Sequence, residues 1–243
     1  MKARAVTAQA RIEALLTIRR GESLLVTLVI PLGILVFFSS VDAVNTSYKD
    51  PVDFLVPGVL ALAVMSSAMV SLGIATGYER RYGVLKRLGS TPLSRAGLLT
   101  AKTLNVLGLE LLQAVVIIVT GIALGWDPTG GLPEAVLLLL VGTVAFAGIG
   151  MLLAGTLRAE ANLAVANGLF LVLLFLGGMA YPLAKLPDAL ETFARLLPAA
   201  ALSETLRGAM DPHVGFPPGE LLVLLVWAVA APLAAARWFR WDE

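Results

Sequence analysis

Residues 54–77, FLVPGVLALAVMSSAMVSLGIATG, decide the fold class of this chain. The run contains no charged residue and is longer than the roughly 20 apolar residues that a helix needs to cross a bilayer. Its apolar residues do not alternate with polar ones, so a strand of a membrane β-barrel does not fit. The stretch is therefore predicted to be a transmembrane helix.

Five more apolar runs are separated by charged residues, proline and glycine, and the full set is 24–41, 54–77, 103–124, 135–157, 163–183 and 221–236. Each carries at most one formal charge, and a charge at the centre of a membrane helix costs about 2.5–3.5 kcal/mol. The 243 residues are 58% apolar and 14% charged, against roughly 45–50% and 25% in soluble domains. These features predict an all-α integral membrane protein with six transmembrane helices.

Charge and composition exclude several function classes. A net charge of +1 is too small for a dedicated nucleic-acid-binding protein, which carries a broad basic surface. The chain has no Cys and a single His, His213, which excludes disulfides, a Cys nucleophile and a Cys/His zinc site. We therefore predict no metal site, although a site made of carboxylates alone is a remote alternative.

The distribution of Lys and Arg predicts the orientation. Fourteen of the 18 lie before the first run, between runs two and three, between runs four and five, or after the sixth run; the other four are Lys49, Lys185, Arg195 and Arg207. By the positive-inside rule, both termini are expected in the cytoplasm.

Residues 1–22 are expected to form an amphipathic helix lying in the membrane interface. Ile12, Leu15 and Leu16 share one helical face, whereas Glu13 and Arg20 lie elsewhere. A solvated basic tail is the alternative. A cleaved signal peptide is disfavoured, because more than about 20 residues precede a long apolar run.

The loop at residues 78–94 has its own helical pattern. Tyr78, Tyr82 and Leu85 have i, i+4, i+7 spacing, with Leu88 close by, and the pattern stops at Gly89. Glu79, Lys86 and Arg87 are expected to point away from this apolar stripe. The pattern predicts a short amphipathic helix, and the alternative is a loop whose charges only set topology.

Two stretches resemble the type-2 ABC exporter permeases, which include drug-resistance and polysaccharide-export membrane subunits. Glu79-Arg-Arg-Tyr-Gly-Val-Leu-Lys-Arg-Leu88 followed by Thr91-Pro92-Leu93 is similar to the family's cytoplasmic loop signature. The second stretch, Gly177-Gly-Met-Ala-Tyr-Pro-Leu183, leads into segments with Leu186-Pro187, Leu196-Leu-Pro198 and Glu204-Thr-Leu-Arg207. The resemblance implies one transmembrane domain over residues 1–243, with an interfacial helix (1–22), a coupling loop (78–94) and an outer re-entrant helical segment (184–220).

The resemblance also implies that separate ATPase subunits hydrolyse ATP with Mg. The chain has no phosphate-binding loop, since Gly97 and Ala101-Lys102-Thr103 have the wrong spacing. We therefore expect no bound cofactor and no catalytic residue here. The implied partners are two ABC ATPase subunits, a second copy or a sister permease, and the lipid bilayer of a bacterial cell membrane. The implied coupling residues are Glu79, Arg80, Gly83, Leu85, Lys86, Arg87, Leu88, Thr91 and Pro92.

Few polar residues occur within the predicted spans. Glu110 lies roughly 12 Å into the third run, with Gln113 one turn further on the same side. Ionisable groups at such depth face the bundle or a wet cavity, so Glu110 either serves transport or forms a structural hydrogen bond. The candidates for the pathway or a relay are Ser67, Ser71, Glu110, Gln113 and Asn167.

Residues 184–220 are too amphipathic to span and too apolar for a flexible loop. A helix is expected between Pro187 and Pro198, and Glu204 and Arg207 can pair on a second one. The segment is predicted to be an outer gate, and the alternative is a surface hairpin without a gating role. The gate candidates are Tyr181, Pro182, Pro187, Pro198, Glu204 and Arg207.

The sequence thus favours the permease of an ATP-driven exporter that moves an amphipathic drug, lipid or glycan-type substrate outward. The alternative is an intramembrane lipid-modifying enzyme using Glu110, Glu204 or His213. The enzyme is disfavoured because these residues are not expected at one membrane depth.

Overall fold

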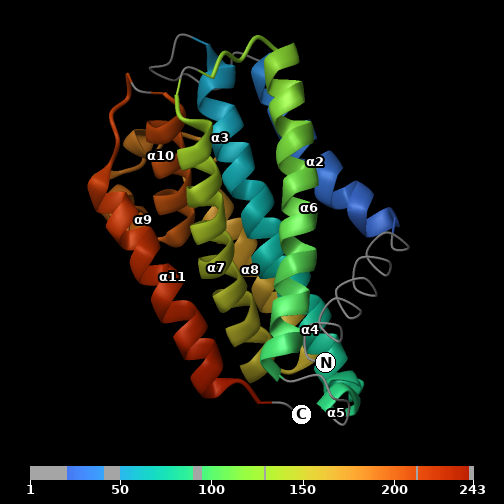
Figure 1. The fold of residues 1–243 in the computed structure, drawn as a ribbon. Coiled ribbons are helices and arrows are strands. Elements are labelled where there is room, and N and C mark those ends of the chain that lie inside the picture. The colour runs from blue at the N-terminus through green and yellow to red at the C-terminus, as the bar shows by residue number, and fades with distance from the viewer. Residues whose placement is uncertain (1–20, 41–49, 90–94, 129, 212, 241–243) are drawn as a thin grey trace.

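The computed structural model describes residues 21–40, 50–89, 95–128, 130–211 and 213–240, and for 21–26, 87–89 and 95–100 it describes the backbone alone. These residues form a bundle of helices, and no strand occurs among them (Figure 1). The elements are α2 (Gly21–Ser40), α3 (Pro51–Val64), η1 (Met65–Ser71), α4 (Leu72–Arg81), α5 (Val84–Gly89), α6 (Arg95–Ala123), α7 (Leu132–Thr156), α8 (Ala159–Leu176), η2 (Leu183–Lys185), α9 (Asp188–Ala194), α10 (Pro198–Met210) and α11 (Pro218–Trp238).

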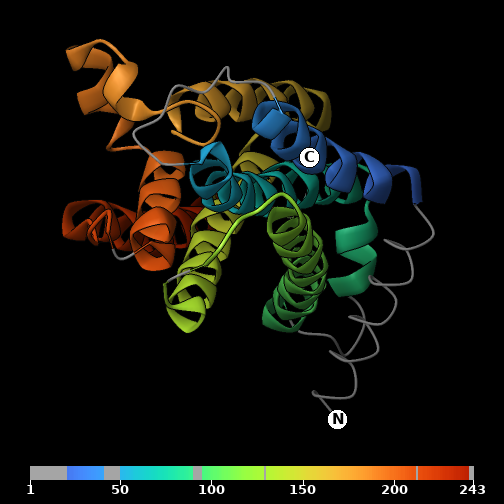
Figure 2. The same ribbon diagram turned by 90° about the horizontal axis from the view of Figure 1, so that it is seen from above.

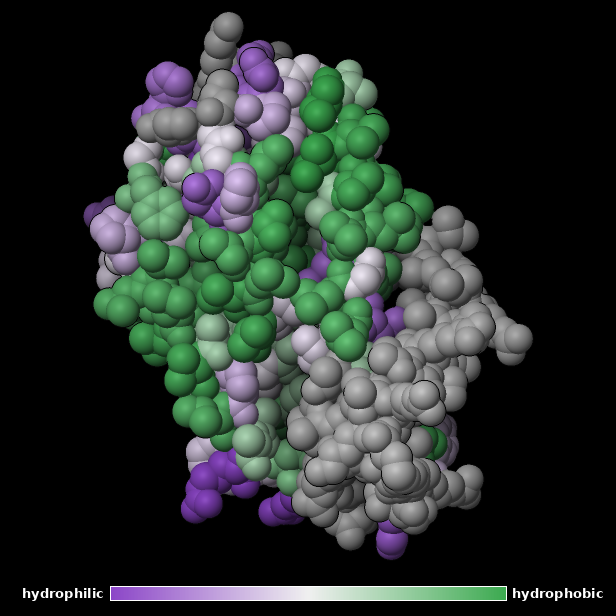
Figure 3. All heavy atoms as spheres, in the orientation of Figure 1, coloured by the Kyte–Doolittle hydropathy of each residue, from purple (hydrophilic) through white to green (hydrophobic). Residues whose placement is uncertain are grey.

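Five helical segments among the described residues are long and apolar enough to cross a membrane: Pro51–Arg81, Ala101–Ala123, Leu132–Thr156, Ala159–Leu176 and Pro218–Trp238. α2 adds the shorter apolar stretch Thr27–Ser40. On the face seen in Figure 3, a broad hydrophobic band lies at mid-height, with hydrophilic residues toward both ends. The chain is therefore an all-α integral membrane protein, as predicted. The interfacial helix expected at residues 1–22 lies almost entirely outside the described residues.

The second apolar run forms the centre of the bundle. α3, η1 and α4 make one continuous helix, of which 83% of the most apolar stretch is buried, against 17–44% for the other four spans. Seen from above, the other long helices surround it (Figure 2). The middle of this helix, η1, is a π-helix, a local widening that often marks functional positions.

Two element boundaries differ from the sequence expectation. The fifth span ends at Leu176 rather than residue 183, because Gly177 caps α8 and Gly178 adopts φ +64°. Pro198 does not end the helix after Pro187 as expected. It begins α10 instead, since proline suits the first turn of a helix, where its missing N–H costs nothing.

Glycines bring the spans into close contact within the subunit. A Cβ on Gly150 of α7 would lie 2.5 Å from the Met69 carbonyl oxygen, and one on Gly73 would lie 3.0 Å from the Gly150 carbonyl oxygen. A Cβ on Gly148 would lie 2.5 Å from the backbone nitrogen of Pro232 in α11. The small residues therefore pack helices against one another inside one chain.

The two ends of the bundle differ in what they carry. The α4–α5 corner, the α7–α8 turn and the carboxyl end of α11 lie at one end (Figure 1). The α6–α7 loop and the α9–α10 segment lie at the other, where the Gly131 amide donates to the Ala209 carbonyl oxygen at 2.9 Å. The first end holds the exposed Arg158, Arg237 and Arg240.

Candidate functional site

The helix predicted across residues 78–88 is broken into two. α4 extends through Tyr78 to Arg81, Tyr82 caps it, and α5 begins at Val84. The break occurs at Gly83, whose φ of +68° favours glycine. The prediction of one helix with a continuous apolar stripe was therefore wrong.

Charged side chains of this loop bind to the ends of neighbouring spans. The Lys102 ammonium lies 2.8 Å and 2.7 Å from the two carboxylate oxygens of Glu79, and Lys102 is buried. The buried Arg80 guanidinium donates to the Leu157 carbonyl oxygen at 2.5 Å. Contrary to expectation, Glu79 does not point away from the protein. These contacts join the end of α4 to α6 and to the α7–α8 turn.

The exposed residues of the loop match only part of the sequence expectation. Leu85, expected to contact a partner, is 3% exposed and packs inside its own chain. Tyr82 and Val84 are 66% and 37% exposed, and Lys86 is exposed. The side chains of Arg87 and Leu88, and all of Thr91 and Pro92, lie outside the described residues.

Two pathway candidates meet at the π-helix. The Ser67 hydroxyl donates to Gln113 Oε1 at 2.8 Å, and Gln113 Nε2 donates to the Thr27 carbonyl oxygen at 3.1 Å. Ser67 and Gln113 are both fully buried. They connect η1, α6 and α2 and do not face open space.

The other two hydroxyl and amide candidates are exposed. Ser71 lies at the end of η1, and Asn167 lies on α8, where its amide donates to the Leu163 carbonyl oxygen at 2.8 Å. Neither residue is brought together with Glu110 or Gln113 by a contact among the described residues.

Glu110 lies near the middle of α6 (Arg95–Ala123) and of the apolar span Ala101–Ala123 within it. The Thr143 hydroxyl on α7 lies 2.6 Å from Glu110 Oε2 and 2.9 Å from the Leu139 carbonyl oxygen. Glu110 and Gln113 thus bind different helices, although both are buried.

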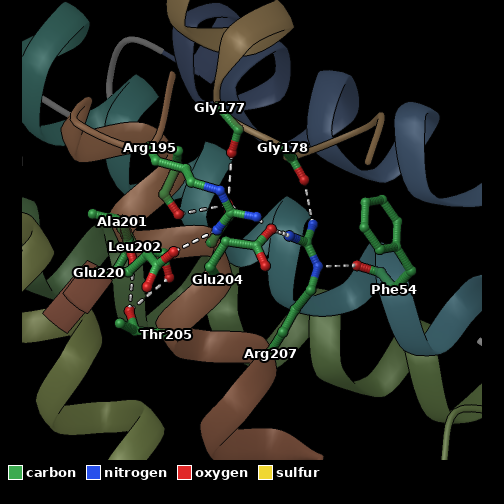
Figure 4. Close-up of polar contacts among 12 residues, drawn as sticks. Phe54, Gly177, Gly178, Arg195, Ala201, Leu202, Glu204, Thr205, Arg207 and Glu220 are labelled. Atoms are coloured by element: carbon green, nitrogen blue, oxygen red, sulfur yellow. Dashed lines mark hydrogen bonds and ion pairs between the residues drawn. The ribbon is translucent and has the colours of Figure 1, made fainter. Parts of the chain in front are cut away.

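Arg207 binds several segments at the end of the bundle that carries the α6–α7 loop. Its guanidinium, 1% exposed, pairs with Glu204 at 2.6 Å and donates to the carbonyl oxygens of Gly178 and, at 3.3 Å, Phe54 (Figure 4). The pairing of Glu204 with Arg207 predicted from their spacing is present. The contacts to Gly178 and Phe54 tie α10 to the turn after α8 and to the start of α3.

The remaining gate candidates flank this cluster. Tyr181 is 46% exposed, Pro182 precedes η2, Pro187 precedes α9 and Pro198 is buried. α10 is buried along most of its length, whereas α9 exposes large apolar side chains, Phe193 at 53% among them. The segment is thus a helical pair with one member packed inside the bundle.

Sequence reasoning missed a second ion-pair group beside Arg207. Arg195 donates to Glu191 at 2.8 Å and to Glu220 at 2.5 Å, which connects the end of α9 to α11 (Figure 4). The hydrogen bond to Glu191 raises the pKa of the Arg195 guanidinium above its ordinary value. Only the i, i+4 spacing of Glu191 and Arg195 was visible in the sequence.

Among the described residues, no group of three or more His, Asp or Glu side chains could hold a metal ion. The polar groups instead connect helices, both at the ends of the bundle and within it.

Comparison with known proteins decides the family. The model of the family described as ABC-2 type transporter matches residues 4–210. The chain belongs to this family. It is also 27% identical over 184 residues to the protein named "Putative transport permease YvfS" of Bacillus subtilis (strain 168), with 71% of this chain and 72% of the relative covered.

As an ABC-2 permease, the chain is a multi-pass membrane protein of the transport class. Permeases of this family work with ABC ATPase subunits and form the membrane component of the transporter. The two stretches that resembled the family are the α4–α5 corner and the α8–α10 segment. These are the regions where buried charged residues hold the spans together.

Proposed function

We propose that this chain is the non-catalytic membrane subunit of an ATP-driven exporter, which moves an amphipathic drug, lipid or glycan-type substrate outward. Two ABC ATPase subunits would hydrolyse ATP and bind Mg. The observation that carries the proposal is the anchoring of the α4–α5 corner by Glu79–Lys102 and Arg80–Leu157. A displacement of this corner by the ATPase would therefore move α4, α6 and α7 together.

The docking surface is proposed to be the exposed part of this corner. Tyr82 and Val84 offer apolar area, and Lys86 adds a positive charge at the end rich in Lys and Arg. By the positive-inside rule this end would be cytoplasmic, as an ATP-hydrolysing partner requires. Gly83 sets the angle of α5, whereas Leu85 holds the helix to its own chain.

The transport pathway is proposed to form between two permease chains, either two copies or this chain with a sister permease. The exposed Asn167 on α8 and Ser71 at the end of η1 favour these faces as the contact or pathway side. The α9–α10 segment, held by Arg207 and Glu204, would gate the outer end. Apolar and small hydroxyl groups suit an amphipathic substrate.

Copurification in mild detergent tests the proposal. An ATPase with nucleotide-binding motifs should copurify with the tagged chain, and Tyr82→Asp with Val84→Asp should weaken that binding by more than about tenfold. Each apolar side chain contributes roughly 1.5–3 kcal/mol when buried, and about 1.4 kcal/mol is tenfold in affinity.

Lys86→Ala is the matched control, since an exposed ion pair contributes about 0–1 kcal/mol. Full ATPase recovery and normal export with the Tyr82→Asp, Val84→Asp variant would show that the corner does not dock the ATPase.

A further inference from the structure

Three exposed arginines lie around the carboxyl end of α11, and we call them the arginine patch. Arg237 lies in the last turn of this helix, Arg240 follows it, and Arg158 lies in the turn between α7 and α8. The Arg240 backbone N–H donates to the Gly155 carbonyl oxygen at 3.0 Å, and the Phe239 ring lies against Gly155. The chain after α11 is therefore held at the end of α7, next to the turn that carries Arg158.

The positive charge of the patch is not balanced by the described residues. No ion pair or side-chain hydrogen bond of the three guanidinium groups occurs within the described part of the chain. Glu160, two residues after Arg158, pairs instead with Arg81 at the end of α4. The patch therefore has room for an anionic group from outside the chain.

α11 brings Arg237 to the level of the lipid headgroups. Four apolar residues at helical spacing are each more than half exposed, and Arg237 continues the same face: Leu222, Val226, Val229 and Leu233. In a membrane, such a face contacts acyl chains. The 21 residues of α11 make it about 31 Å long, close to the roughly 30 Å of the hydrocarbon core.

Trp238 supports this depth for the end of α11. It is 60% exposed, and tryptophan is enriched where a membrane helix meets the headgroups. In Figure 3, hydrophilic atoms lie directly below the hydrophobic band at the carboxyl end of α11. The exposed face of α11 and the arginines beside its end thus match the two parts of a lipid, the acyl chain and the headgroup.

Position and charge favour a lipid over a protein partner for the patch. α11 and α5 lie on opposite sides of the bundle (Figure 1 and Figure 2), so the patch is separate from the proposed ATPase docking surface. Guanidinium groups bind phosphate oxygens through paired, charge-assisted hydrogen bonds. A phospholipid with net negative charge therefore fits both the arginines and the apolar face above them.

We propose that the arginine patch binds the headgroup of an acidic phospholipid, whose acyl chains lie along the exposed face of α11. Each arginine near the headgroup should strengthen binding about fivefold. The site involves neither the α4–α5 corner nor an ATPase. It therefore goes beyond the proposed transport function and can be tested without it.

Titration of the purified full chain in a neutral detergent, read out by native mass spectrometry, tests the site. Phosphatidylglycerol should bind several-fold more tightly than phosphatidylcholine with the same acyl chains. The difference should shrink as the salt concentration rises, because salt screens exposed charges. Glycerol phosphate, which carries the charge but no acyl chain, should not displace phosphatidylglycerol at an equal concentration.

Substitutions of single charges identify the residues that bind. Arg237→Gln should weaken phosphatidylglycerol binding about fivefold, whereas Arg237→Lys, which keeps the charge, should retain most of it. The triple variant Arg158→Gln, Arg237→Gln, Arg240→Gln should lose the preference for phosphatidylglycerol. Lys185→Gln is the matched control, since it removes one exposed positive charge at the other end of the bundle and should bind like the unaltered chain.

Acidic residues near the patch give a test of opposite sign. Asp242 and Glu243 follow Arg240 in the sequence and lie outside the described residues. Asp242→Asn with Glu243→Gln removes two negative charges and should tighten phosphatidylglycerol binding. Weaker binding in this variant would contradict the proposal.

Two further results would overturn the proposal. The first is equal affinity of the unaltered chain for phosphatidylglycerol and phosphatidylcholine. The second is an unchanged preference in the triple variant eluting at the native size: the arginines would then only set topology or, if ATPase copurification were lost as well, contact the ATPase. Because lipid binding is measured without an ATPase, its failure and the failure of the proposed function are distinguishable.

Discussion

The guanidinium carbon of Arg207 lies 3.8 Å from the centre of the Phe54 ring, and the same side chain donates to the Phe54 carbonyl oxygen. The two residues are far apart in the sequence, one at the start of α3 and the other in α10. A desolvated cation over an aromatic ring contributes about 2 kcal/mol or more. This contact fixes the α9–α10 segment to the central helix of the bundle.

Replacing Arg207 should destabilise the protein strongly. Arg207→Met removes the ring contact, two carbonyl contacts and the partner of Glu204, so we expect a loss of about 3–5 kcal/mol. The thermal unfolding midpoint in detergent would measure it. Glu204→Gln should cost less, about 1–2 kcal/mol, because Glu204 is 24% exposed and Gln can still accept a hydrogen bond. Equal midpoints for Arg207→Met and the unaltered chain would contradict this role.

The Glu79–Lys102 pair should matter for energy coupling. Lys102 is 4% exposed, so Lys102→Met leaves the Glu79 carboxylate without its ion-pair partner and frees the α4–α5 corner from α6. We expect substrate-stimulated ATP hydrolysis to fall several-fold while the ATPase still copurifies.

The charge-swapped double variant Glu79→Lys, Lys102→Glu is the control for this pair. It should restore much of the loss, with a coupling energy of about 1–3 kcal/mol. If the single variants Glu79→Lys and Lys102→Glu both show normal substrate-stimulated ATP hydrolysis, the pair serves only stability or insertion.

Position 150 is too closely packed to tolerate a side chain. In Gly150→Ala, the Cβ would lie 2.5 Å from the Met69 carbonyl oxygen, and a backbone atom cannot move aside cheaply. We expect a loss of about 1–3 kcal/mol, measured by thermal unfolding in detergent. Gly108→Ala on α6 meets nothing within 4 Å and should be neutral or slightly stabilising. Similar midpoints for the two variants would show that α7 and η1 have room to separate.

The orientation can be tested with single cysteines, because the chain has no native Cys. Lys86→Cys and His213→Cys place exposed thiols at opposite ends of the bundle. A membrane-impermeant maleimide applied to intact cells should label His213→Cys and spare Lys86→Cys. Lysis should expose Lys86→Cys to the reagent, which confirms that the thiol reacts. The opposite pattern in intact cells would reverse the proposed orientation.

Hydropathy was sufficient for the fold class. A helix that crosses a bilayer has to be apolar along its length, whatever its neighbours are. Helices therefore form most of each of the six runs among the described residues, and the two stretches that resembled the family lie at the corners where charged residues bind spans. The pairing of Glu204 with Arg207 was also predictable, because residues three apart on a helix are neighbours.

The break at Gly83 was not predictable from spacing. The sequence 78–88 keeps a helical period across Gly83, but the chain turns there with φ +68°. As a result, Leu85 is buried while Tyr82 is exposed. Helical periodicity shows which residues share a face, but not which neighbour that face meets.

The sequence by itself determined an all-α membrane protein, the positions of its apolar helices and its family resemblance, because these depend on local composition and short-range spacing. Only the tertiary structure decided which polar groups meet. Lys102 binds Glu79, Arg207 lies over Phe54, and Glu110 accepts a hydrogen bond from Thr143. These pairings join residues on different helices, so they depend on how the helices pack against one another. The periodicity of one helix does not predict that packing.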